Sequence, residues 1–255
     1  MLRIDQKPHP GHMSGMCMSH QKFTINIAAV LTGRAKPLGR DDVSSAIAKI
    51  PRHERLTVSM TGFTEDEQAD RKHHGGLEKA IHHYASDHYG FWRSQKGIDQ
   101  NVLSMPGAFG ENISSEGLTE DTVCIGDRWR MGTALLEVSQ ARQPCWKLNI
   151  RFGLPDMAEQ VQRSGKTGWY YRVLSEGSVT AGDNMVLEER PCPEWTLTRL
   201  LRLLYHDPLN KQELTEAMTL SVLTENWTVI FANRLKTGYV EDWNKRLFGI
   251  MQNYP

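Results

Sequence analysis

Residues 138–148 read Val-Ser-Gln-Ala-Arg-Gln-Pro-Cys-Trp-Lys-Leu and end a run in which apolar and polar side chains alternate as in a β-strand. Pro144 keeps the backbone before it extended. Cys145 follows directly, between the cations Arg142 and Lys147. These charges lie close enough in sequence to stabilise a thiolate, the form of cysteine that attacks electrophiles and binds soft metals. The stretch therefore predicts a strand that leads into a reactive cysteine.

The alternative for Cys145 is a structural role, since free cysteine is among the most buried residue types. However, burying Arg142 and Lys147 beside an inert thiol costs free energy when neither cation has a partner. The flanking charges therefore favour a functional cysteine.

Outward from this stretch, residues 22–189 contain short β-prone runs separated by Gly, Asp and Asn turns, a pattern typical of a β-barrel or sandwich. Strands are predicted at 22–31, 55–63, 80–84, 122–130, 134–139, 168–174 and 185–188. Two helices are expected to cover an open barrel edge, one at 87–95 with Ser86 as its N-cap and one at 155–163. The fold class is therefore mainly β.

After Pro193 the pattern becomes helical. Leucines at 197, 200, 201 and 204 have the spacing of one buried stripe, and Thr196 is placed to cap this helix. Further helices are predicted at 211–220, 225–236 and 240–248. Helices this short must pack on one another or on the barrel, and the module they form is a candidate for homodimerisation or for covering a substrate cleft. The predicted division is a flexible leader over 1–21, a barrel domain over 22–190 and a helical domain over 191–255.

The composition excludes several functional classes. The 255 residues carry 30 Lys plus Arg and 30 Asp plus Glu, so no net charge attracts nucleic acid or an anionic membrane. No apolar run approaches the ~20 residues that span a bilayer. The four cysteines lack the paired spacing of zinc sites and fit a reducing compartment better than a disulfide scaffold. We therefore expect a soluble, cytoplasmic protein.

A second candidate segment reads His-Gly-Gly at 74–76. Paired glycines let the backbone approach a ligand closely and turn N–H groups toward an anion, and Lys79 adds a charge. The alternative is an ordinary hairpin turn, for which Gly-Gly is a common signal. Zinc is disfavoured here, because adjacent His82 and His83 on a strand point to opposite faces.

A third segment reads Pro-Gly-Ala-Phe-Gly-Glu-Asn-Ile-Ser at 106–114. The carboxylate of Glu111 and the amide of Asn112 are suited to bind ring nitrogens of a heterocycle. The alternative is a loop held by hydrogen bonds from its own side chains to its backbone.

Together the three segments resemble the MOSC domain, the molybdenum cofactor sulfurase C-terminal domain, and within it the YiiM-like branch. The motifs that carry the resemblance are His-Gly-Gly at 74–76, Phe-Gly-Glu-Asn at 109–112 and Ser-Gln-x-Arg-x-Pro-Cys-x-Lys-Leu at 139–148. The resemblance covers residues 23–250. One departure is the loop at 65–68, which reads Glu-Asp-Glu-Gln where relatives have Gly-Asp before the Glu-Gln or Gly-Gln pair.

The resemblance implies a MOSC-type β-barrel with a few covering helices, followed by a small C-terminal three-helix domain. It implies that Cys145 binds the metal of a molybdenum cofactor of the molybdopterin type. The implied activity is reduction of small N-hydroxylated compounds, such as 6-hydroxylaminopurine, to amines. Electrons are expected from a separate reductase, because the chain has no Rossmann or flavin motif. The alternative is a carrier that binds the cofactor, or a sulfur atom as a persulfide on Cys145, without turnover.

The other candidate residues have supporting roles under this resemblance. Arg142 and Lys147 suit the phosphate of a pterin cofactor. His74 is the candidate proton donor, because the unperturbed pKa of imidazole lies near neutrality and N–O cleavage consumes protons. The predicted catalytic residues are thus Cys145 and His74, and the predicted cofactor contacts are His74, Gly75, Gly76, Lys79, Glu111, Asn112, Arg142 and Lys147.

Overall fold

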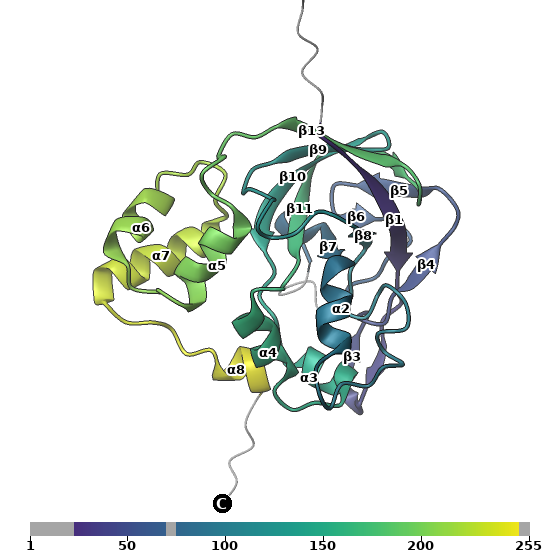
Figure 1. Cartoon of the computed structure of the whole chain (residues 1–255), viewed down its shortest axis with the longest axis horizontal. Helices are drawn as coiled ribbons and strands as arrows, with labels where there is room; N and C mark the ends of the chain where they lie inside the picture. Colours follow the sequence, from purple (N-terminus) through teal and green to yellow (C-terminus); the bar gives the residue numbers. More distant parts are fainter. Residues whose placement is uncertain (1–22, 70–74, 250–255) are drawn as a thin grey trace, which may run out of the picture.

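The computed structural model describes residues 23–69 and 75–249 (Figure 1). The predicted leader at 1–21 and the predicted contact His74 lie outside these ranges. Seven strands form a closed barrel in the order β13-β9-β10-β11-β7-β8-β1, and β1 pairs with β13 to complete the ring. Their bounds are β1 Thr24–Thr32, β7 Ile81–Ala85, β8 Ile113–Ser115, β9 Arg128–Met131, β10 Ala134–Ala141, β11 Trp169–Ser175 and β13 Asn184–Glu189. The predicted mainly β barrel is confirmed.

Short strands that the sequence did not predict extend the barrel. A two-stranded sheet is formed by β2 (Lys36–Leu38) and β3 (Arg40–Ser45), and β4 (Ile50–Arg52) pairs with β1. The predicted strand at 55–63 is instead the hairpin of β5 (Leu56–Ser59) and β6 (Gly62–Phe63), to which β12 (Gly177–Val179) adds a third strand. The chain turns there because Gly62 adopts a φ of 113°, a conformation that favours glycine.

The predicted strand at 122–130 begins only at Arg128. The Asp127 carboxylate accepts a hydrogen bond from the backbone N–H of Cys124 at 3.0 Å, which folds the preceding residues into a turn. Arg190 pairs with the same carboxylate, with Nη2 2.7 Å from Oδ2. The ion pair between the buried Asp127 and the partly exposed Arg190 holds the turn against the barrel wall.

Alternation along the strands fills the barrel with large side chains. Trp129, Trp169 and Tyr171 have no exposed surface and belong to one apolar cluster. His83 lies inside the barrel as well, with its ring nitrogens 3.1 Å from the Tyr171 hydroxyl and 2.9 Å from Ser115 Oγ. Its neighbour His82 lies on the other face of β7, against the ring of Tyr170, as the alternation predicted.

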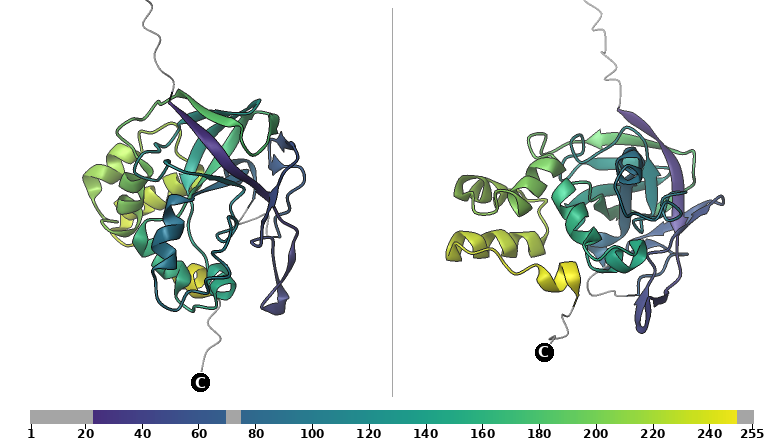
Figure 2. Two further views of the ribbon diagram at one scale, coloured as in Figure 1. Left: turned by 45° about the vertical axis from the view of Figure 1, so that its right-hand side comes forward. Right: turned by 60° about the horizontal axis from the view of Figure 1, so that its bottom comes forward.

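Helices gather at one side and at the lower end of the barrel in the view of Figure 1. They are η1 Leu77–Lys79, α2 Asp87–Arg93, α3 Lys147–Phe152, α4 Met157–Ser164, α5 Leu197–Tyr205, α6 Lys211–Ala217, α7 Glu225–Thr237 and α8 Asn244–Phe248. The helices α5, α6 and α7 form the predicted helical module, and the chain then returns to place α8 beside α4 (Figures 1 and 2). No described helix combines the length and apolarity that crossing a membrane requires.

The helix signals in the sequence have mixed outcomes. The predicted leucine stripe of α5 is buried, and Thr196 caps this helix by accepting a hydrogen bond from the backbone N–H of Arg199 at 3.2 Å. Ser86 occupies the predicted N-cap position of α2, but its side chain makes no capping hydrogen bond, and its hydroxyl donates to the carbonyl of Ser115 instead. The helix α3 was not predicted, although it begins two residues after Cys145.

Candidate functional site

Cys145 lies where two hollows meet. The first, which we call the inner cavity, has a volume of about 80 Å³ and is lined by polar groups of Lys49, Asp66, Lys79, His82, Asn112, Arg142, Cys145, Lys147 and Tyr170, among others. The second, which we call the outer groove, has a volume of about 1390 Å³ and lies between the barrel and the C-terminal helices. The two share Lys79, Cys145, Lys147 and Tyr170, so the cysteine stands at their boundary.

The end of β10 and the start of α3 place Cys145 at this boundary. Beyond the strand, the backbone N–H of Arg142 still bonds the carbonyl of Gly168 at 2.9 Å. The carbonyl of Cys145 accepts a hydrogen bond from the N–H of Leu148 at 2.9 Å, which begins the helical turn. The residue is 8% exposed, so ligand access is through the two hollows rather than from open surface.

Arg142 is one of four cationic residues that line the inner cavity, with Lys49, Lys79 and Lys147. The residue is 6% exposed, and among the described residues its Nη1 has no hydrogen-bond partner. A buried donor without a partner costs about 1–3 kcal/mol. The fold therefore retains an unsatisfied cationic donor that an anionic ligand would satisfy.

His82 lines the same cavity, and its role was missed by the sequence analysis. Burial, reinforced by the charge of Arg142, holds the pKa of His82 well below its ordinary value, although a hydrogen bond to the carbonyl of Gly110 opposes the shift. The ring is therefore neutral at pH 7, and its Nε2 is buried without a hydrogen-bond partner in the described part of the chain. The alternation on β7 was the available signal, since it turns His82 away from the barrel interior.

A buried ion pair closes another side of the inner cavity. Lys49 and Asp66 form this pair, with side chains 7% and 4% exposed. Burial lowers the pKa of Lys49, and the neighbouring Asp66 opposes that shift. Asp66 also accepts from the Gly33 N–H at 2.7 Å and from Asn112 Nδ2 at 2.9 Å. These bonds hold the 65–68 loop in place despite its departure from the family pattern.

The two residues of the third motif are separated by the structure. Asn112 lines the inner cavity, and its Oδ1 accepts the backbone N–H of His82 at 3.1 Å. Glu111 lines neither hollow: it is fully buried and accepts from the Tyr89 hydroxyl at 2.5 Å and the N–H groups of Gly107 and Phe109 at 2.7 and 3.0 Å. For Glu111 the structure therefore agrees with the alternative given for this segment, a loop held by hydrogen bonds between its own side chains and backbone.

Of the two predicted glycines, Gly75 lines a hollow and Gly76 lines neither. Gly75 lines the groove. Gly76 adopts a φ of 92°, and no atom lies within 4 Å of the position of a Cβ there, so the backbone is open on that side. Lys147 lines both hollows, and its Nζ donates to the carbonyl of Ser44 at 3.2 Å.

The other wall of the outer groove comes from the end of the helical region. Trp243, Phe248 and the aromatic neighbour of the cysteine, Trp146, supply apolar surface there. Local sequence gave no reason to join residues near 245 with residues near 145.

The donor set fits a ligand that combines a soft metal with an anionic group. A thiolate suits a thiophilic metal, and an unpaired guanidinium N–H beside two lysines suits a phosphate. In the described residues, no group of three or more His, Cys, Asp and Glu side chains is arranged to hold a metal ion by itself.

Comparison with known proteins identifies the family of this chain. The family model of the MOSC domain matches residues 70–186, and that of the YiiM-like 3-alpha helix domain matches residues 195–238. Protein YiiM of Escherichia coli (strain K12) is 38% identical over 222 residues, which is 86% of this chain and 97% of that protein.

Two further matches extend the comparison. A protein named Reductase from Gibberella moniliformis is 36% identical over 197 residues, 77% of this chain but 35% of that protein. The crystal structure of YiiM from Escherichia coli superposes with a TM-score of 0.75 at 30% identity, covering 89% of this chain and all of that one (100%). The chain therefore belongs to the MOSC domain family, in its YiiM-like branch.

Proposed function

We propose that the protein is a molybdenum-cofactor-dependent reductase that converts N-hydroxylated compounds, such as 6-hydroxylaminopurine, to the corresponding amines. In the overall reaction the N-hydroxyl group takes up two electrons and two protons, the N–O bond breaks, and an amine and water are released. Membership of the MOSC family and a relative named as a reductase support an oxidoreductase.

The observation that carries the proposal is the position of Cys145, between a cavity with an unsatisfied cationic donor and a groove open to a substrate. Cys145 provides the thiolate ligand of the metal. Arg142, with Lys79 and Lys147, binds the phosphate of the cofactor. When bound, the cofactor supplies a metal centre that exchanges an oxygen atom and a pair of electrons with the substrate.

The outer groove suits a flat heterocyclic substrate. Its volume of about 1390 Å³ exceeds the ~300–1,000 Å³ of ordinary ligand pockets, which leaves room for the cofactor and a second molecule. The aromatic rings of Trp146, Trp243 and Phe248 offer apolar faces on which a purine would stack.

The proton and the electrons have separate sources in this proposal. His82 is neutral at pH 7 because its pKa is held low, so it accepts a hydrogen bond rather than donating a proton. His74, which lies outside the described residues, remains the proposed proton donor. Electrons come from a separate reductase.

Turnover tests the proposal. Protein loaded with the cofactor and given an artificial one-electron reductant is expected to convert 6-hydroxylaminopurine to adenine, and Cys145→Ser is expected to abolish this conversion. A loaded protein that does not turn over, but whose Cys145 gains the mass of one sulfur atom during sulfur transfer, contradicts the reductase and favours the carrier.

A further inference from the structure

A single residue of the C-terminal segment is hydrogen-bonded on both sides of Cys145. The Nη1 atom of Arg246 donates to the carbonyl of Pro144 at 2.6 Å. The carbonyl of Arg246 accepts from the backbone N–H of Trp146 at 2.8 Å. The residues before and after the cysteine are therefore held by one residue that lies about a hundred positions away in sequence.

The Arg246 side chain is itself fixed by neutral partners. Its Nη2 donates to Oε1 of Gln162 on α4 at 2.6 Å, and its guanidinium lies 5.6 Å from the ring centre of Tyr205 on α5. Across the described ranges, no carboxylate forms an ion pair with Arg246. Its hydrogen bonds instead join α4, the cysteine loop and α8.

The rest of the segment packs against the same loop. Asn149 of α3 donates to the carbonyl of Leu247 at 2.8 Å, and the Leu247 side chain is 5% exposed in the apolar cluster that includes Leu148. The position of a Cβ on Gly249 lies 3.5 Å from the Trp146 ring. Figure 2 shows α8 returning from the helical module to this end of the barrel.

We propose that Arg246 is a positioning residue for Cys145: it holds the cysteine loop in the conformation that presents the sulfur to both hollows. The helical module thus contributes to the site by fixing the loop that carries the metal ligand. Any consequence for catalysis rests on the proposed function, whereas the position of the sulfur does not.

Alkylation of the metal-free protein tests this inference without the cofactor. Trypsin releases residues 143–147 as a peptide whose single cysteine is Cys145, so mass spectrometry follows its reaction with iodoacetamide apart from the other thiols. Rates are measured across a range of pH. The rate constant at the alkaline plateau, where the thiol is fully ionised, reports how accessible the sulfur is. The pH at the midpoint of the profile reports the charges around the sulfur.

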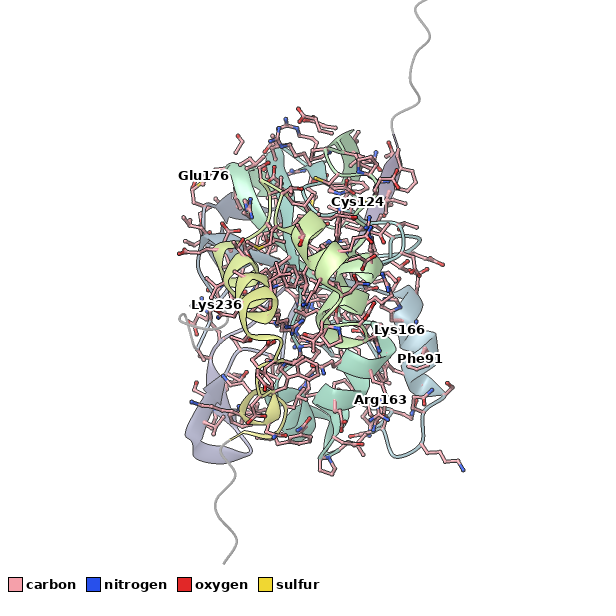
Figure 3. All side chains as sticks on the ribbon, turned by 90° about the vertical axis from the view of Figure 1, so that its left-hand side faces the viewer. Phe91, Cys124, Arg163, Lys166, Glu176 and Lys236 are labelled. Atoms are coloured by element: carbon pink, nitrogen blue, oxygen red, sulfur yellow. The ribbon has the colours of Figure 1, made fainter. Side chains whose placement is uncertain are left out.

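Because Cys145 is only 8% exposed in the held loop, freeing the loop is expected to open a wider path to the sulfur. The plateau rate in Arg246→Met is therefore expected to rise by more than twofold, on the order of tenfold for the loss of a charge-assisted hydrogen bond. Arg246→Lys keeps the charge but replaces the planar fork of two donor nitrogens with a single ammonium, so its plateau is also expected to rise more than twofold. The matched control is Arg163→Met on α4, whose side chain is 65% exposed and forms an ion pair with Glu159 at 3.6 Å (Figure 3).

Circular dichroism first establishes that each variant folds. The inference is overturned if folded Arg246→Met has a plateau rate within twofold of the parent's rate. If the methionine variant does not fold, the same result in Arg246→Lys overturns it. An equal rise in Arg163→Met also overturns it, because the effect would then not be specific to Arg246.

Discussion

At the scale of single residues, Arg142 and Arg234 make an instructive comparison, because both side chains are buried but their partners differ. Arg234, 1% exposed, pairs with Glu241 and donates to the carbonyls of Leu203 and Leu204 at 3.3 and 3.0 Å. Arg142, 6% exposed, has no hydrogen-bond partner for Nη1 within residues 23–69 and 75–249. The first arrangement stabilises the helical module. The second costs stability, and the proposed cofactor would satisfy it.

Replacing each arginine with methionine distinguishes the two roles. Arg234→Met is expected to lower the free energy of unfolding by about 2–4 kcal/mol, because buried carbonyls lose their donors. Arg142→Met is expected to leave it unchanged or to raise it by up to about 3 kcal/mol in the metal-free protein, because the unsatisfied donor is removed. Cofactor retention is expected to fall at least ~tenfold through loss of a charge-assisted contact. Chemical denaturation and molybdenum content measure the two effects. A destabilised Arg142→Met that keeps its cofactor would contradict the assignment.

At the scale of elements, the loop at 107–111 acts as a support rather than as a binding surface. Glu111 organises it through hydrogen bonds from Tyr89 and two backbone N–H groups. The loop leads into Asn112, which lines the inner cavity and bonds the backbone of His82. The third sequence motif therefore combines one supporting residue with one residue of the cavity wall.

The support role of Glu111 predicts a loss of stability. Glu111→Gln is expected to lower the free energy of unfolding by about 2 kcal/mol, because an amide NH₂ would face buried donors that need an acceptor. The exposed Glu116→Gln is the matched control and is expected to have no measurable effect. Chemical denaturation of both variants measures this effect. An unchanged stability in Glu111→Gln together with a loss of bound cofactor would show that Glu111 contacts the ligand instead.

At the scale of the whole molecule, the sequence predicted the parts whose signals are local. Strands such as β10 and β11 alternate over many residues, and the α5 leucines recur at helical spacing. Strands of three residues, such as β8, carry too little periodicity to detect. Cys145 and Arg142 were predictable because they are neighbours in one motif.

Other parts of the site depend on contacts between distant residues. Lys49 meets Asp66 only after the loops around the barrel mouth have folded, and Arg246 reaches Pro144 only after the chain has passed through the whole helical module. No local sequence pattern predicts contacts between residues so far apart in the chain. His82 had a local signal in strand alternation, but its significance depends on Arg142, which follows a different strand.

The molybdenum content of freshly purified Cys145→Ser protein tests the central claim most directly. Elemental analysis is expected to find molybdenum in the parent and in the control Cys124→Ser, since Cys124 lies away from both hollows with Sγ 3.4 Å from the carbonyl of Pro193. In Cys145→Ser the metal is expected to be lost while thermal unfolding stays close to that of the parent. A folded Cys145→Ser protein that keeps the parent's molybdenum would contradict the account.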